Sequence, residues 1–142
     1  MLSQNELQRY ALFGGLPEEQ IEKILPLMEK EEYKAGDDII VEGKPNDKIR
    51  FILEGRVTVT KEGLFLCEFK DGDVFGEMEV LEIMPSDASI KAQCAVTVMS
   101  ISNRALREIY KSDIKTFSMI IMNLARDLSR RLRRMNERAL HL

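Results

Sequence analysis

Closely spaced turn signals constrain the fold of this chain more than any other feature of its sequence. Between Tyr33 and Ser102, short runs rich in β-branched and aromatic residues alternate with glycine-containing turns. The runs expected to form strands are 39–41, 50–53, 56–60, 64–69, 74–75, 89–93 and 96–101. Short strands separated by turns at close intervals indicate an antiparallel sandwich or barrel. We therefore predict a mainly β protein built on a jelly-roll-like β-barrel.

Helical patterns flank the β-region on both sides. Ser3 and Glu6 form a capping box that predicts a helix over residues 3–12, and Pro17 starts a second helix whose apolar positions continue to Met28. After the strands, the pattern predicts a capped helix start at Ser102 and a long helix from about Asp113 to Arg138 or beyond. The 142 residues suffice for one domain with a core. We expect a single domain, with N-terminal helices at 1–32, the barrel at 33–102 and C-terminal helices at 103–142.

The stretch from Phe75 to Ala92 carries the residues best suited to binding a ligand. It reads FGEMEVLEIMPSDASIKA. Gly76 allows close backbone approach, and successive amides in a turn or short helix can form an anion-binding site. Glu77 places one carboxylate at the mouth of that loop.

This stretch resembles the phosphate-binding cassette of the cyclic-nucleotide-binding domain family, whose pattern is roughly F-G-E-[LM]-A-L-x4-P-R-x-A-[ST]-[VI]-x-A. A second match covers Gly36 to Val59, where GDDIIVEGKPNDKIRFILEGRVTV is similar to the first half of the family pattern. The resemblance implies a β-barrel, a cAMP or cGMP ligand, and a Glu77 carboxylate that accepts hydrogen bonds from the ribose hydroxyl. The ligand-binding residues that it implies are Phe75, Gly76, Glu77, Met78, Ser86, Asp87, Ala88 and Ser89.

Residue 86 departs from the family pattern at the position that pairs with the phosphate. The arginine that pairs with the cyclic phosphate is Ser86 here, Asp87 adds a negative charge beside it, and the alanine after the Glu-Met pair is Glu79. Losing a bidentate, charge-assisted pair in a desolvated site costs about 2–5 kcal/mol, or roughly 30-fold or more in affinity. Lys91 is a candidate to compensate, but its alternation with Ile90 indicates that it faces away from the core. We therefore expect weakened or altered nucleotide binding.

The last helix carries an apolar seam. Its members recur at alternating intervals of four and three, as in a left-handed coiled coil, and they are Ile121, Ala125, Leu128, Leu132, Met135, Ala139 and Leu142. The seam either pairs with the same helix of a second chain or packs on the β-domain. In the family that the chain resembles, this helix caps the nucleotide and, in bacterial activators, forms the dimer axis. We therefore expect a homodimer through the C-terminal helix.

Charge gives little reason to expect a nucleic-acid or membrane partner. The net charge is -3, so any such partner would need a local basic patch. The last helix holds the one concentration of arginines, which we expect to be a solvated face that complements the helix macrodipole; its members are Arg126, Arg130, Arg131, Arg133, Arg134 and Arg138. No helix-turn-helix pattern follows, so we do not expect a sequence-specific DNA-binding module.

The chain offers little material for enzyme chemistry. His141, the single histidine, lies next to the end of the sequence, and Cys67 and Cys94 lack metal-ligand spacing. We expect no catalytic residues, no metal and no cofactor other than a cyclic-nucleotide ligand. The start of the sequence does not resemble a signal peptide, and no apolar run approaches the length of a membrane span, so a cytoplasmic location is expected.

Three functional hypotheses follow. The first is a non-enzymatic regulatory or sensor domain that binds cAMP, cGMP or another small ligand, with the C-terminal helix as a lid. The second is a ligand-independent, dimerising protein-interaction module of the same fold. The third, which we rank below the others, is a binder of a cation or a hydroxyl-rich ligand that uses Glu77, Glu79 and Asp87.

Overall fold

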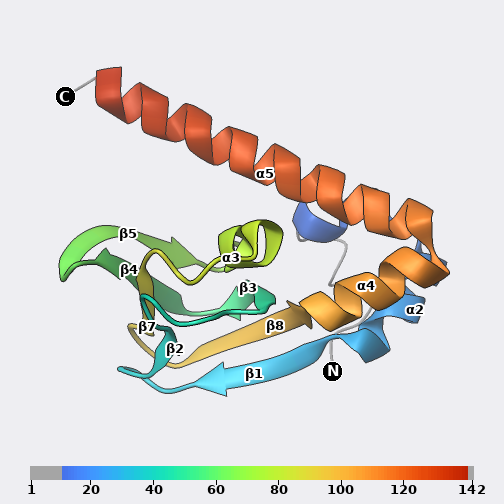
Figure 1. Ribbon diagram of the computed structural model, residues 1–142, viewed down its shortest axis with the longest axis horizontal. Helices are drawn as coiled ribbons and strands as arrows, with labels where there is room; N and C mark the ends of the chain where they lie inside the picture. The colour runs from blue at the N-terminus through green and yellow to red at the C-terminus, as the bar shows by residue number, and fades with distance from the viewer. Residues whose placement is uncertain (1–10, 141–142) are drawn as a thin grey trace. The chain divides into compact units, whose positions relative to one another are not determined.

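The computed structural model describes residues 11–140 (Figure 1). Most of the helix expected at residues 3–12 lies outside this range, and Ala11–Phe13 form a short 3-10 turn, η1. The described residues divide into two compact units, one of residues 26–107 and the other of residues 11–25 together with 108–140. The single domain expected from the sequence remains a prediction.

The unit of residues 26–107 is built around two four-stranded antiparallel sheets (Figure 1). One sheet has the order β1-β8-β3-β6 and the other β2-β7-β4-β5. The strands are β1 (Glu29–Tyr33), β2 (Asp38–Ile40), β3 (Lys48–Glu54), β4 (Arg56–Lys61), β5 (Leu64–Lys70), β6 (Val74–Phe75), β7 (Ser89–Ala92) and β8 (Val96–Ser102). The mainly β fold predicted from the turn signals is confirmed, and each expected strand is present within two residues of its predicted ends.

Strand β1 corrects the sequence analysis, which placed helices up to residue 32. The expected second helix ends early: α2 spans Glu18–Ile24, and Leu25–Leu27 form the 3-10 turn η2. Pro26 explains this end, because proline lacks the N–H that an α-helix requires. The following sequence, EKEEY, pairs along its whole length with β8. Glutamate and lysine are depleted in strands, so the pattern concealed β1.

The apolar core of the β unit lies between its two sheets. Its buried residues come from both sheets and are Ile40, Ile52, Val57, Val59, Phe75, Ile90, Ala92, Val96 and Val98. Phe69 stacks on Phe75 with ring centroids 6.3 Å apart. Burial of these side chains supplies the main driving force for closing the two sheets on each other.

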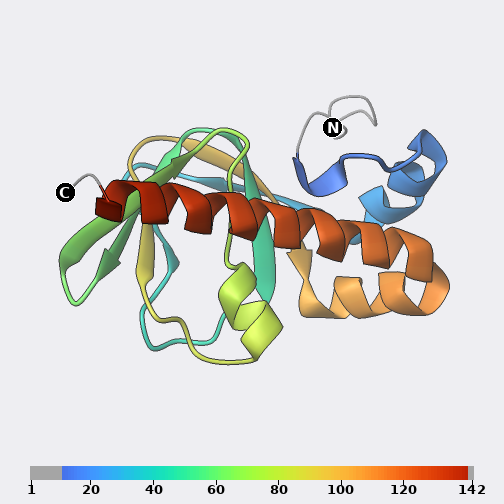
Figure 2. The ribbon, with the colours of Figure 1, turned by 90° about the horizontal axis from the view of Figure 1, so that it is seen from above.

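The second unit is helical. Its longest element, α5, spans Ile114–Leu140, and Figures 1 and 2 both show η1 lying against it. The Nδ2 group of Asn123 donates hydrogen bonds to the carbonyls of Leu12 (3.1 Å) and Gly14 (2.8 Å). Asn123 shares one helical face with the buried residues Thr116, Ile120 and Leu124. This buried face is not the predicted seam.

Helix α4 (Asn103–Ser112) links the two units along the chain. Ser102 caps its start, because the Ser102 Oγ accepts a hydrogen bond from the N–H of Ala105 (3.0 Å). Asp113 separates α4 from α5, and its Oδ1 accepts a hydrogen bond from the N–H of Thr116 (3.2 Å). Hydrogen bonds from Thr116 lower the pKa of the Asp113 carboxyl below its ordinary value. The capped helix start predicted at Ser102 is confirmed.

Candidate functional site

The cassette, residues 75–92, begins at the end of β6 and continues through a short helix and a loop into β7. Helix α3 spans Glu77–Glu82, and Gly76 precedes it with φ of 86°. A Cβ atom at Gly76 would lie 2.6 Å from the carbonyl oxygen of Lys48, so the position requires glycine on both conformational and steric grounds. Ile83 ends the helix with φ of 56°, which is strained for a β-branched residue.

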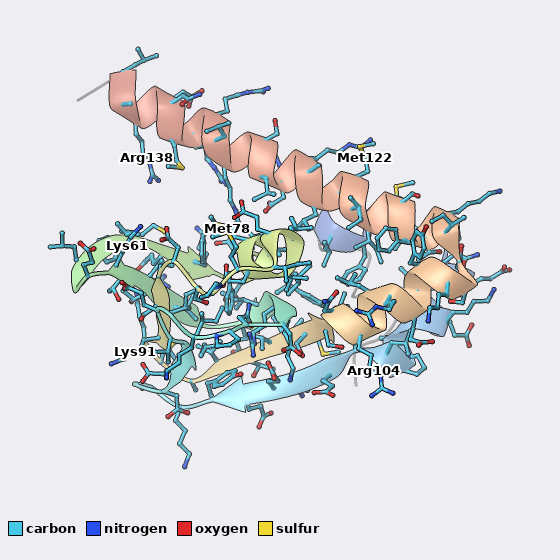
Figure 3. All side chains as sticks on the ribbon, viewed as in Figure 1. Lys61, Met78, Lys91, Arg104, Met122 and Arg138 are labelled. Atoms are coloured by element: carbon cyan, nitrogen blue, oxygen red, sulfur yellow. The ribbon has the colours of Figure 1, made fainter. Side chains whose placement is uncertain are left out.

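The residues predicted for the ligand site lie in two segments of the cassette. Phe75, Gly76 and Glu77 are buried at the junction of β6 and α3, and Glu77 is only 3% exposed. Met78 is an exposed residue of α3 (Figure 3). The remaining predicted residues, 86–89, follow the loop after α3, where Ser86 is buried and Asp87 is exposed.

Ser86 occupies the position where the family pattern has its arginine. It is 4% exposed, and its hydroxyl donates a hydrogen bond to Oε1 of Glu79 (3.0 Å). Its backbone is held on both sides, because its N–H donates to the carbonyl of Lys44 (2.9 Å) and its carbonyl accepts from the N–H of Gly43 (2.8 Å). The side chain at this position is therefore enclosed and neutral.

Asp87, the next residue, has a cation beside it that the sequence analysis missed. The Nζ of Lys61 lies 2.8 Å from Oδ1 and 2.9 Å from Oδ2 of Asp87, and Figure 3 labels Lys61 at the end of β4. The hydrogen bond and charge of Asp87 raise the pKa of the Lys61 ammonium. Lys91 is exposed and lies 3.8 Å from Asp38, which agrees with its predicted orientation away from the core.

The end of the cassette is tied to neighbouring turns. The Oγ of Ser89 accepts a hydrogen bond from the N–H of Glu42 (2.9 Å), and Oε1 of Glu42 accepts one from the N–H of Glu62 (3.0 Å). Residue 62 lies in the turn between β4 and β5. The loop containing residues 86–89 is thus connected to the turn after β2 and to the β4–β5 hairpin.

A polar network lies on β1 and β3, near the start of the cassette. The Nε of Arg50 donates to Oε1 of Glu31 (2.8 Å), and the Nζ of Lys48 lies 3.2 Å from Oε2 of the same carboxylate. Burial raises the pKa of Glu31, but the hydrogen bonds and charges of Arg50 and Lys48 outweigh it and lower the pKa below its ordinary value. The Tyr33 hydroxyl also donates to Glu31 (3.2 Å), and burial raises the pKa of that phenol.

The chemistry available at the cassette is that of binding. A buried carboxylate at Glu77 can accept hydrogen bonds from a hydroxyl group, and the neighbouring backbone amides can donate to an anion. Ser86 and Lys61 already engage Glu79 and Asp87, so two of the three carboxylates considered for a cation ligand are paired. Among residues 11–140, no group of three or more His, Cys, Asp or Glu side chains is arranged to hold a metal ion. Within the same range, no helix is long and apolar enough to cross a membrane.

Comparison with known families identifies the β unit. The family described as "Cyclic nucleotide-binding domain" matches residues 30–113. A cGMP-dependent protein kinase of Caenorhabditis elegans is 31% identical over 86 residues, which cover 61% of this chain and 11% of the kinase. A CRP-like cAMP-activated global transcriptional regulator of Mycobacterium tuberculosis is 27% identical over 135 residues, covering 92% of this chain and 58% of the regulator. The chain thus spans only part of the length of these curated relatives.

Solved structures share the fold. A cyclic nucleotide-binding domain from Methylobacillus flagellatus superposes with a TM-score of 0.86 at 24% identity, covering 97% of this chain and 80% of that chain. A putative cyclic nucleotide-binding protein from Geobacter metallireducens has a TM-score of 0.80 at 26% identity, with 93% and 99% covered. These similarities agree with the predicted family and fold.

Proposed function

This chain belongs to the cyclic nucleotide-binding domain family, and we propose that it is a non-enzymatic regulatory module with weakened affinity for cAMP or cGMP. The observation that carries the proposal is the contrast between two cassette positions. Glu77 is present and buried, as a ribose-binding carboxylate should be, whereas the position of the phosphate-pairing arginine holds the neutral Ser86. The site therefore keeps its ribose contact and lacks its strongest phosphate contact.

Two local contacts support a weakened rather than an abolished site. Lys61 lies against Asp87, so the extra negative charge near the expected phosphate position is offset by a cation. The hydroxyl of Ser86 can still donate a hydrogen bond, although in the described structure it donates to Glu79. A neutral donor and an offset charge do not replace a bidentate guanidinium, so we place the loss of affinity at roughly 30-fold or more.

Substitution of Glu77 tests this function. In isothermal titration with cAMP and cGMP, Glu77→Ala should remove binding, because it deletes the one buried acceptor for the ribose hydroxyl. Glu82→Ala is the matched control, since Glu82 is an exposed carboxylate of the same helix. Equal affinity of Glu77→Ala and the unsubstituted protein would refute the proposed binding mode.

Dimerisation through α5 is the second candidate function, and the exposure of the helix seam favours it. The seam residues Leu132 and Met135 are 59% and 63% exposed and Ala125 is exposed, whereas Ile121 and Leu128 are half-buried. The face of α5 that is buried within the described chain runs instead through Ile120 and Leu124. We propose that a second copy of the chain covers the seam, as a ligand-independent contact or as part of the response to a nucleotide. The location proposed for this module is the cytoplasm.

A further inference from the structure

The side chain of Asn46 connects the segment before β3 to the start of the cassette by hydrogen bonds. Its Nδ2 donates hydrogen bonds to the carbonyls of Lys48 (3.0 Å) and Gly76 (3.2 Å). Its Oδ1 accepts from the N–H of Lys48 (3.3 Å) and from Nη1 of Arg50 (2.9 Å). A side-chain amide has two donor hydrogens and two acceptor lone pairs, so every hydrogen-bonding position of Asn46 is used.

The contact with Gly76 lies directly before the ribose-binding carboxylate of the proposed function. Gly76 is adjacent to Glu77, the first residue of α3, and its φ of 86° sets the direction in which the helix leaves β6. A Cβ atom at residue 76 would lie 3.0 Å from Nδ2 of Asn46 and 2.6 Å from the carbonyl oxygen of Lys48. The start of α3 therefore rests closely on Asn46 and on the backbone of β3.

The contact with Arg50 links Asn46 to the ion pair between Arg50 and Glu31. Arg50 is 7% exposed, and its Nε donates to Glu31 on β1, which β8 separates from β3 in the sheet. Lys48 shares the same carboxylate. A buried guanidinium that donates to both a carboxylate and an amide oxygen has a narrow choice of orientations, because moving it would leave buried charge unpaired. Arg50 thus fixes the side-chain amide of Asn46.

We infer that Asn46 is a positioning residue for the nucleotide site. Resting on the proposed function, the inference is that the series Glu31, Arg50, Asn46 and Gly76 holds the start of α3 so that the Glu77 carboxylate is preorganised before a ligand arrives. Asn46 acts through the Gly76 carbonyl and does not contact the ligand. Preorganised groups bind a ligand more tightly because less ordering is required on binding.

Hydrogen exchange on the full chain, without ligand, tests whether Asn46 holds the start of α3. Asn46→Asp keeps an oxygen toward Arg50 but removes both donors and places a carboxylate beside two carbonyl oxygens. We expect amide exchange in residues 76–82 to accelerate about tenfold, with no change in β8 or in β3 beyond Lys48, which Asn46 contacts directly. Arg50→Lys, which keeps the charge beside Glu31 but loses the fork that reaches Asn46, should accelerate the same segment to a smaller extent. It also serves as a second test should Asn46→Asp fail to fold.

Gln93→Glu is the matched control. It makes the same amide-to-acid change at an exposed residue whose Nε2 donates to Thr58 on β4 (2.6 Å) and Glu68 on β5 (2.8 Å), neither of which belongs to residues 76–82. Exchange in residues 76–82 should be the same in this variant as in the unsubstituted protein. The inference is overturned if Asn46→Asp leaves this segment unchanged, or if it accelerates exchange equally throughout the β unit.

Titration with cAMP and cGMP separates this inference from the proposed function. If the unsubstituted protein binds either nucleotide, Asn46→Asp should raise the dissociation constant about tenfold while the melting temperature stays within a few degrees. Unchanged affinity would overturn the positioning role even if exchange accelerates. If the unsubstituted protein binds neither nucleotide, the proposed function fails, and the exchange experiment alone decides whether Asn46 holds the start of α3.

Discussion

The hydroxyl of Ser86 donates a hydrogen bond to Oε1 of Glu79, 3.0 Å away, at the position where related cassettes carry a phosphate-pairing arginine. The two substitutions relative to the family pattern are therefore in contact with each other. An arginine placed at residue 86 would meet the Glu79 carboxylate before it met a ligand. The departures at 79 and 86 are best treated as a pair.

We predict that Ser86→Arg alone raises cyclic-nucleotide affinity only slightly, whereas Ser86→Arg with Glu79→Ala raises it at least tenfold. In the single variant, Glu79 competes with the phosphate for the new guanidinium. Isothermal titration of the single and double variants checks this, with Glu79→Ala alone as the control. A single variant that binds as tightly as the double variant would show that Glu79 does not compete.

Asp87 offers an independent route to tighter binding. Replacing Asp87 by Ser removes a negative charge and releases Lys61, which lies 2.8 Å from it. We expect the affinity for a cyclic nucleotide to rise about three- to tenfold, with the gain falling as salt is added because the groups are exposed. Asp87→Ser with Lys61→Met should lose most of the gain. A gain that survives loss of Lys61 would assign the effect to Asp87 alone.

Acid sensitivity should arise at Glu31. Its pKa is lowered in the folded protein from an ordinary value of about 4.5, so the folded state binds fewer protons than the unfolded state in this range. Its contribution to stability is therefore present above about pH 4.5 and is lost as the pH falls through the lowered value.

Glu31→Gln tests the predicted direction of this pH dependence of stability. At neutral pH the variant should be less stable by about 2 kcal/mol, because Arg50 keeps its buried charge and loses its carboxylate. At about pH 3 the difference between variant and unsubstituted protein should shrink. Urea unfolding at the two pH values measures both quantities. A difference that is constant with pH would contradict the assigned pKa direction.

The seam of α5 should govern oligomeric state without governing the fold. Leu132→Asp with Met135→Asp should convert a dimer to a monomer in sedimentation velocity, since charges in an apolar seam oppose pairing. The monomer should still unfold in a cooperative thermal transition, because both side chains are exposed in the single chain. Arg133→Asp, one position outside the seam, is the control. A monomeric unsubstituted protein would rule out the dimer.

The strands were predictable where their residue composition is typical of strands. Runs such as Val96–Ser102 combine β-branched residues with flanking turns, so their pattern indicates their structure. β1 was not predictable, because Glu31 is accommodated by Arg50 and Lys48 on β3, a contact that appears only when the sheet forms. Tertiary pairing overrode local propensity in this strand.

The candidate site shows the same division. The cassette and the identity of Glu77 follow from a continuous stretch of sequence. Lys61 lies 26 residues from Asp87, and Asn46 lies 30 residues from Gly76. Each of these contacts depends on how the hairpins and the loop before β3 fold back on the cassette. No spacing rule within the sequence indicates such contacts.

Isothermal titration of the unsubstituted protein with cAMP and with cGMP, at concentrations high enough to detect millimolar binding, tests the central claim most directly. The account predicts binding to at least one nucleotide with a dissociation constant of roughly 0.1 mM to a few millimolar, as expected for a site with its ribose carboxylate and without its arginine. Sub-micromolar binding would contradict the weakened site. No heat with either nucleotide would contradict nucleotide binding and leave the dimerising module.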